Sequence, residues 1–174
     1  MECATCLDIA RIKGRLSQER SAEEKRRLVE ITRMLIGLRK AWLPGVMNEE
    51  PAPYPAEPSA QGIEVRFHHE SLDVYQAALD FTRWFLGLPG VGELPNRLCR
   101  EIDKSATSVV LNVAEGNGRY SELDHLRFVE VASASAVRAG VSLDLYDRKA
   151  CQARLETAPG RELLGRITAM LARF

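Results

Sequence analysis

Apolar residues recur at intervals of three and four along most of this chain, which is the period of amphipathic α-helices. Between residues 67 and 174 four such stretches follow one another, and no strand-like alternation competes with them. The connections between the stretches are short, so neighbouring helices are expected to run antiparallel. The pattern predicts an all-α fold in which residues 67–174 form an up-and-down four-helix bundle.

Capping and helix-breaking residues predict where these four helices begin and end. Serine and threonine are favoured just before a helix, proline in its first turn, and glycine just after its end. The expected caps and breaks are, in chain order, Ser71, Pro89–Gly92, Pro95, Gly116–Gly118, Ser121 with Asp124, and Thr157–Pro159.

The expected second helix of the bundle carries a polar stripe beside its apolar face. The members of this stripe are three or four residues apart, and they are Ser105, Ser108, Asn112 and Glu115. Alanine and serine alternate over residues 132–136 of the next helix, which lets two backbones approach closely. We therefore expect Ser133 or Ser135 to meet the polar stripe, and Gly116 to end the helix. Asn112→Ala should then lower stability, whereas Lys25→Ala, on a solvated surface, should not.

Residues 1–45 are predicted to form a helical hairpin whose two helices meet between Ser17 and Ser21. Ser21 and Glu24 have the spacing of a capping box at the start of the second helix. This helix carries a narrow apolar stripe made of Leu28, Ile31, Leu35, Leu38 and Trp42. The stripe is a candidate partner-binding surface, and it has three possible destinations: its own bundle, the same segment of another subunit, or a foreign protein. Four prolines within residues 46–66 indicate an extended linker between the hairpin and the bundle.

Charge limits the functional classes that fit the chain. It has 24 basic and 24 acidic side chains, so no net field draws it to nucleic acid or to a membrane surface. Residues 1–43 nevertheless contain ten basic residues against six acidic ones. Such an excess usually marks a solvated helix surface, and a contact with nucleic acid or an acidic partner is the alternative.

No motif in the sequence predicts catalysis or a cofactor. Cys3 and Cys6 have the spacing of half a zinc site, but a second pair is missing, so no metal is expected. The chain has no glycine-rich phosphate loop after a strand and no nucleophile with a recognisable base. Without an export signal or an apolar run long enough to span a bilayer, the cysteines are expected to be reduced thiols in the cytoplasm.

Three segments carry a resemblance to a known family. They are LDVYQAALDF at residues 72–81, the stretch 104–119 with its Asn-Val-Ala-Glu-Gly block, and FVEVASASAVRAGVSL at residues 128–143. Over residues 67–174 the chain resembles the four-helix-bundle proteins of 23S rRNA intervening sequences, which include the accessory protein of diversity-generating retroelements. The resemblance implies a ring-like homopentamer without known catalysis. It also implies a reverse transcriptase partner and nucleic-acid contact through a basic surface.

Two functions remain open from the sequence. The first is a non-enzymatic, oligomeric accessory protein of a nucleic-acid-processing system, and the second is an oligomeric protein–protein scaffold whose amino-terminal helices dock a partner. Glu115 and Arg119 are expected to form a salt bridge one helical turn apart, or else Arg119 faces phosphate. The candidate nucleic-acid-binding residues are Lys104, Arg119 and Arg127 in the bundle, and Arg11, Lys13, Arg15, Lys25, Arg26 and Arg27 in the hairpin.

Overall fold

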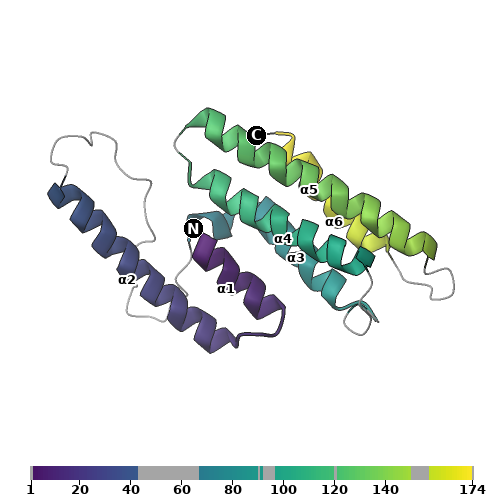
Figure 1. Cartoon of the computed structure of the whole chain (residues 1–174), viewed down its shortest axis with the longest axis horizontal. Coiled ribbons are helices and arrows are strands. Elements are labelled where there is room, and N and C mark those ends of the chain that lie inside the picture. Colours follow the sequence, from purple (N-terminus) through teal and green to yellow (C-terminus); the bar gives the residue numbers. More distant parts are fainter. Residues whose placement is uncertain are drawn as a thin grey trace.

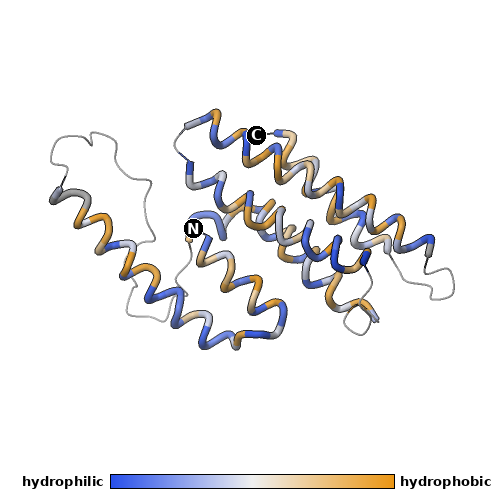
Figure 2. The backbone as a smooth tube through the Cα atoms, viewed as in Figure 1, coloured by the Kyte–Doolittle hydropathy of each residue, from blue (hydrophilic) through white to orange (hydrophobic). Residues whose placement is uncertain are grey.

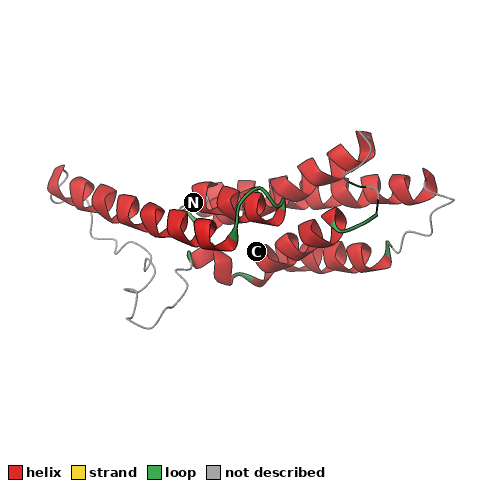
Figure 3. Ribbon diagram, turned by 90° about the horizontal axis from the view of Figure 1, so that it is seen from below, coloured by secondary structure: helices red, strands yellow, loops and turns green. Residues whose placement is uncertain are grey.

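The computed structural model of the chain describes residues 2–42, 67–89, 91, 97–119, 121–149 and 157–173. Every regular element within these residues is helical, as Figure 3 shows. The elements are α1 (Glu2–Ile12), α2 (Gln18–Trp42), the short 3-10 helix η1 (His68–Ser71), α3 (Asp73–Leu86), α4 (Arg97–Asn117), α5 (Glu122–Lys149) and α6 (Ala158–Leu171). The predicted all-α helical bundle is confirmed. The predicted linker over residues 46–66 lies outside the described residues.

Helices α3 to α6 form the bundle. Each of them packs on two others, so that α5 lies between α4 and α6, and α3 closes the other side (Figure 1). The apolar faces that the sequence pattern predicted meet in one core. Its largest fully buried apolar side chains are Tyr75, Phe81, Phe85, Ile102, Leu143 and Ile167.

The interface between α4 and α5 is built as its small side chains predict. The hydroxyls of Ser108 and Ser135 are 2.9 Å apart, and the Asn112 Nδ2 donates to the Ser108 carbonyl at 2.7 Å. At Gly116 an added Cβ would lie 3.0 Å from the Cβ of Phe128, so glycine lets the first turns of α5 pass close to the end of α4. One detail differs from the expectation: Ser105 is buried, but its hydroxyl has no hydrogen-bond partner among the described residues.

Two of the predicted caps are wrong, and a third is confirmed. Helix α2 begins four residues earlier than expected, because Ser17 rather than Ser21 accepts a backbone N–H, that of Arg20 at 3.3 Å. Ser71 does not cap α3, since its hydroxyl donates to the His68 carbonyl within η1. Ser121 caps α5 by accepting the Asp124 N–H at 3.4 Å.

The amino-terminal helices α1 and α2 form a hairpin, and α1 packs on α3 and α4 (Figure 1). A Schellman motif ends α1: the N–H of Arg15 bonds to the Ala10 carbonyl, and that of Gly14 to the Arg11 carbonyl. Gly14 has φ +67°, a conformation that favours glycine. Helix α1 is thus part of the packed unit. Within the described residues α2 lies along α1, and it also contacts Phe67 and, through Lys25, Glu70 of η1.

Candidate interaction surfaces

A buried network of charged and polar groups joins the hairpin to the bundle. The Lys25 Nζ donates to Asp8 Oδ1 and to Glu70 Oε1, each at 2.7 Å. The Tyr75 hydroxyl donates to the other Asp8 oxygen at 2.9 Å. The second Glu70 oxygen accepts the Phe67 N–H at 3.1 Å. We call these four side chains, Asp8, Lys25, Glu70 and Tyr75, the Asp8 network.

Burial shifts the protonation of this network and of the histidine beside it. Desolvation raises the pKa of Glu70 above its usual value, although Lys25 opposes the shift, and it raises the pKa of Tyr75. His69 is fully buried, with its Nε2 3.3 Å from the Thr5 hydroxyl and its ring edge-on to Tyr75. Desolvation lowers the pKa of His69 to about 4, so the ring is neutral at pH 7. No hydrogen-bond partner for its Nδ1 lies among the described residues.

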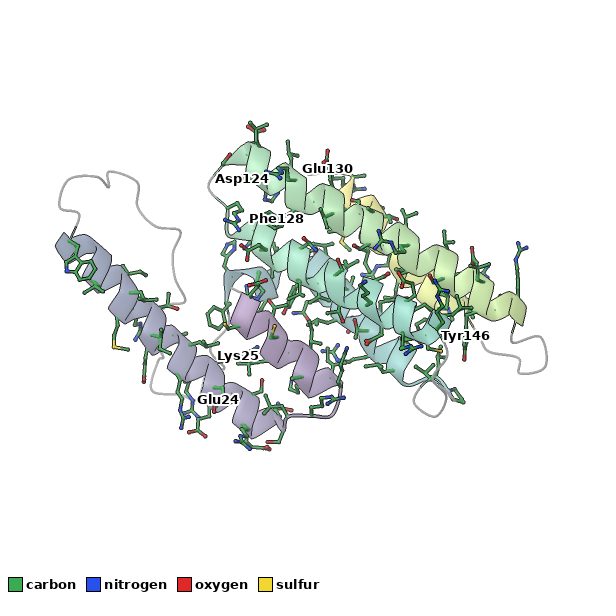
Figure 4. All side chains as sticks on the ribbon, in the orientation of Figure 1. Glu24, Lys25, Asp124, Phe128, Glu130 and Tyr146 are labelled. Atoms are coloured by element: carbon green, nitrogen blue, oxygen red, sulfur yellow. The ribbon has the colours of Figure 1, made fainter. Side chains whose placement is uncertain are left out.

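The structure changes the interpretation of Lys25. Its side chain is 12% exposed and lies between α2 and α1, where Figure 4 labels it. The solvated surface expected from the sequence is wrong at this position, because two carboxylates of α1 and η1 hold the ammonium group. An open cleft of about 470 Å³ beside it is lined by both charge signs, including Asp8, Arg11, Glu70 and Arg83.

The bundle's candidate phosphate-binding residues fall into two places. Arg119 lies in the α4–α5 turn, where its guanidinium pairs with Glu115 and stacks 4.9 Å from the centre of the Phe128 ring of α5. Arg127 is exposed beside Asp124, 4.0 Å away. Lys104 stands 13 residues before the end of α4, about 20 Å along the helix axis. Two of the three therefore lie in the segments at the α4–α5 turn, Arg119 within it and Arg127 in the second turn of α5.

The hairpin's candidate cations do not form one surface. Lys13 donates to Asp103 of α4 at 2.8 Å, and Lys25 belongs to the Asp8 network. Arg11 lies 3.9 Å from Asp8, and Arg27 pairs with Glu23 and Glu24 along α2. Arg15 and Arg26 are exposed. We therefore leave Lys13 and Lys25 out of any proposed nucleic-acid surface.

Among the described residues, the exposed large apolar side chains all lie on α2 and α5. On α2 the exposed apolar side chains are Ile31, Met34, Leu35, Leu38 and Trp42, which we call the α2 stripe. Leu28, predicted to belong to this surface, instead packs beside Val29 and Phe67 in a small core of its own. On α5 the side opposite the core exposes Leu123, Ala134, Val137, Val141 and Leu145, which we call the α5 outer face. Figure 2 shows the apolar positions of both helices.

Cys3 and Cys6 are exposed, and both line an apolar groove between α1 and α2 with Leu7, Leu28 and Ile31. Burial raises the pKa of the Cys6 thiol, with Cys3 and Glu2 adding to the shift. Among the residues that the structure describes, no group of three or more His, Cys, Asp or Glu side chains is placed to hold a metal ion. Cys151 lies outside those residues.

Sequence reasoning missed the Asp8 network and the α5 outer face. The partners of Asp8 are 17 and 67 residues away, so no local spacing points to them. The α5 outer face did leave a signal, since Val137, Val141 and Leu145 lie off the side of α5 that carries the core residues Ala132, Ala136, Ala139 and Leu143. Apolar residues on both sides of a surface helix indicate a second packing partner.

A comparison with known families covers the bundle. A family model described as 23S rRNA-intervening sequence protein matches residues 70–173, which run from η1 through α6 and exclude α1 and α2. No curated protein and no solved structure matches the chain. None of the helices in the described parts of the chain is both long and apolar enough to cross a lipid bilayer.

Proposed function

Because this chain belongs to the family of 23S rRNA-intervening sequence proteins, we propose that it is a non-enzymatic, oligomeric accessory protein of a nucleic-acid-processing system. In this role it binds a protein of that system and contacts RNA or DNA. The family match over the whole bundle carries the proposal, because it gives the chain a role related to nucleic acid. The α2 stripe and the α5 outer face support a role in binding protein.

The α4–α5 turn is the nucleic-acid contact that we propose. Arg119 lies in this turn and Arg127 in the second turn of α5, and arginine donates two parallel hydrogen bonds to phosphate. Phe128 stacks against Arg119 and holds its guanidinium at the surface. In an oligomer, several copies of this small site would bind the same nucleic acid, and avidity would raise the overall affinity.

Fluorescence anisotropy with labelled single-stranded RNA and DNA tests the nucleic-acid contact. The wild-type protein is expected to bind at about 50 mM salt, and to lose affinity steeply by about 200 mM, as phosphate contacts do. The double variant Arg119→Ala/Arg127→Ala should bind more weakly and show a shallower dependence on salt. The control Arg15→Ala/Arg26→Ala changes two exposed arginines of the hairpin and should bind as the wild type does. Equal binding by both double variants would contradict this site.

A scaffold that binds protein without touching nucleic acid is the second candidate. It is favoured by the zero net charge of the chain and by the ion pairs that engage Lys13 and Lys25 with carboxylates of the same molecule. Absence of binding to either nucleic acid at about 50 mM salt, where phosphate contacts are strong, would select this candidate.

The protein partner that we propose is a reverse transcriptase, by the resemblance to accessory proteins of retroelements. Co-expression with a reverse transcriptase encoded next to this chain, followed by affinity capture, tests the pairing. Co-elution after nuclease treatment would support direct contact between the proteins. Loss of the enzyme on nuclease treatment would mean that nucleic acid alone joins them.

A further inference from the structure

The cleft beside Lys25 lies where the hairpin meets the bundle. Its volume is about 470 Å³, which is within the range of pockets that hold small ligands. Helix α1 contributes Asp8 and Arg11 to its lining, and α2 contributes Lys25, which Figure 4 labels. The residues that η1 and α3 contribute include Glu70, Gln76 and Arg83. Three cations and two carboxylates therefore meet in one cleft, and they come from both parts of the molecule.

Both carboxylates of the cleft already have partners within the chain. The two oxygens of Asp8 accept hydrogen bonds from Lys25 and from the Tyr75 hydroxyl. Those of Glu70 accept from Lys25 and from the Phe67 N–H. Both acidic residues are more than nine-tenths buried. A cationic ligand would therefore have to compete with these donors for a carboxylate oxygen.

The cations of the cleft, in contrast, have N–H groups left over. The Arg11 guanidinium is 3.9 Å from Asp8, which is too far for a hydrogen bond, and it makes no other contact of this kind with the described residues. The Arg83 guanidinium donates through Nη1 to Asp80, so its Nη2 and Nε have no acceptor in the same part of the chain. Lys25 uses two of its three N–H groups. The unused hydrogen-bonding capacity of the cleft is therefore that of donors on positive charges.

These unused groups fit an anionic ligand. A guanidinium donates two parallel N–H groups to a phosphate or a carboxylate, and such charge-assisted bonds are stronger than neutral ones. Arg11 comes from α1 and Arg83 from α3, so an oxyanion that both hold joins the two helices. Gln76 lies about 10 Å from Arg83 along the axis of α3, and its amide nitrogen donates to the Glu70 carbonyl. Its amide oxygen is left to accept a hydroxyl of the molecule that carries the anion.

We propose that this cleft binds a small oxyanion, the phosphate or carboxylate group of a small molecule, between Arg11 and Arg83. The ligand links the hairpin to the bundle, because α1 holds one side of it and α3 the other. The site goes beyond the proposed function, since the nucleic-acid contact at the α4–α5 turn uses neither arginine. It also needs no second copy of the chain.

Thermal unfolding at constant ionic strength tests this proposal. The probes are inorganic phosphate and succinate, and sodium chloride in their place is the reference. At ten times its Kd, a ligand that binds only the folded state should raise Tm by about 3–6 °C. The rise should saturate with concentration, because a single site fills. A rise that does not saturate is the general effect of salts excluded from protein surfaces, and it would overturn the proposal. No rise with either probe would overturn it as well.

A matched pair of double variants assigns the effect to the cleft. Arg11→Gln/Arg83→Gln changes partly exposed side chains, so circular dichroism should show a folded protein, and its Tm should not respond to either probe. The control Arg15→Gln/Arg138→Gln also removes one arginine of the hairpin and one of the bundle, both exposed and outside the cleft lining, and should respond as the wild type does. Equal responses of the two variants would contradict the site. If the first variant does not fold, Arg83→Gln alone should weaken binding of the effective probe by about tenfold or more, and unchanged binding would count against the proposal.

Amide hydrogen exchange distinguishes a small oxyanion from the phosphates of a nucleic acid. The effective probe should increase the protection of α1, because the ligand holds Arg11 against the bundle. It should do so equally in the variant Arg119→Ala/Arg127→Ala, which lacks the proposed nucleic-acid contact. If single-stranded RNA protects α1 in this variant and neither small probe does, the cleft belongs to a nucleic-acid surface, and the proposal is wrong.

Discussion

The α4–α5 interface and the junction between hairpin and bundle are held by different physical means. At the first, small side chains let two helices approach, with Ser108 bonded to Ser135 and Gly116 beside Phe128. At the second, Asp8, Lys25 and Glu70 are buried together around the Tyr75 hydroxyl. The first depends on shape and on groups that do not titrate near neutral pH. The second depends on the Lys25–Glu70 ion pair and the hydrogen bond from Tyr75 to Asp8, which form only while the hairpin is docked.

This difference means that the two regions should respond to different perturbations. A buried ion pair adds little net stability over apolar packing, yet removal of one partner leaves the other charge unpaired in a dry site. A shape-dependent interface instead fails when volume is added. Docking of the hairpin should therefore weaken when a charged partner is removed or the pH is lowered. Packing of the bundle should instead weaken when a larger side chain is introduced.

Asp8→Ala should have the largest effect. The Tyr75 hydroxyl would lose its acceptor and the Lys25 ammonium would keep only Glu70, at a cost of about 3 kcal/mol. Urea unfolding gives the loss of stability, and amide hydrogen exchange should show that α1 loses protection first. The exposed Asp124→Ala is the control. An effect no larger than that of the control would mean that the network does not hold the hairpin. Lys25→Ala is expected to act in the same direction, which reverses the expectation from sequence.

Acid should loosen the junction through His69. The unfolded chain takes up a proton near pH 6.5, while the folded chain does so only near pH 4. The unfolded state binds more protons between these values, so stability falls as the pH drops from about 6.5 to about 4, by about 3 kcal/mol in all. Glu70, whose pKa is raised, acts with the opposite sign near the acid end of this range.

His69→Gln removes the titrating group and keeps a polar side chain beside Thr5. Urea titrations at several pH values should show a steeper loss of stability in the wild type than in this variant. The exposed His68→Gln is the matched control. Parallel curves for the wild type and His69→Gln would show that the buried ring does not couple docking to pH.

Gly160→Ala should test the bundle by adding bulk between α3 and α6. A Cβ at Gly160 would lie 2.0 Å from the Cζ3 of Trp84, so the indole must move, at a cost of about 1–3 kcal/mol. Gly165→Ala, in the same helix, meets no atom within 4 Å and should stabilise the protein by up to about 1 kcal/mol. Thermal unfolding of the two variants should shift in opposite directions, and a shift in the same direction would contradict the packing at Trp84.

Asn112→Ala should have the smallest effect of the four. Its Nδ2 donates to the carbonyl and the hydroxyl of Ser108, and the side chain is half-buried, so the loss should be about 1 kcal/mol. Gln18→Ala, exposed at the start of α2, is the control in the same urea titration. A loss as large as that of Asp8→Ala would show that the α4–α5 interface, too, depends on polar pairing.

The spacing of apolar residues predicted which segments form helices more accurately than the capping residues predicted where those helices begin. The three-and-four spacing of apolar residues predicted the helices of the bundle, and the Ser121 cap follows from a rule that involves neighbours in sequence. The same rule failed at Ser21, because Ser17 four residues earlier offers the same chemistry. The rule failed at Ser71 because the Ser71 hydroxyl donates to the His68 carbonyl within η1, so it does not cap α3. Where two local caps compete, packing decides between them.

The amino-acid sequence by itself determined the helical class, the bundle and the close approach of α4 to α5, because these follow from periodicity and side-chain size along single helices. The folded structure was needed to show that Lys25 is largely buried, that Asp8 and Glu70 meet it, and that the apolar side chains of α2 and α5 are exposed among the described residues. Those outcomes depend on residues tens of positions apart. The free energy of a buried charge or of an exposed apolar stripe depends on the residues that face it in the folded protein. The spacing of residues along the sequence does not identify those partners.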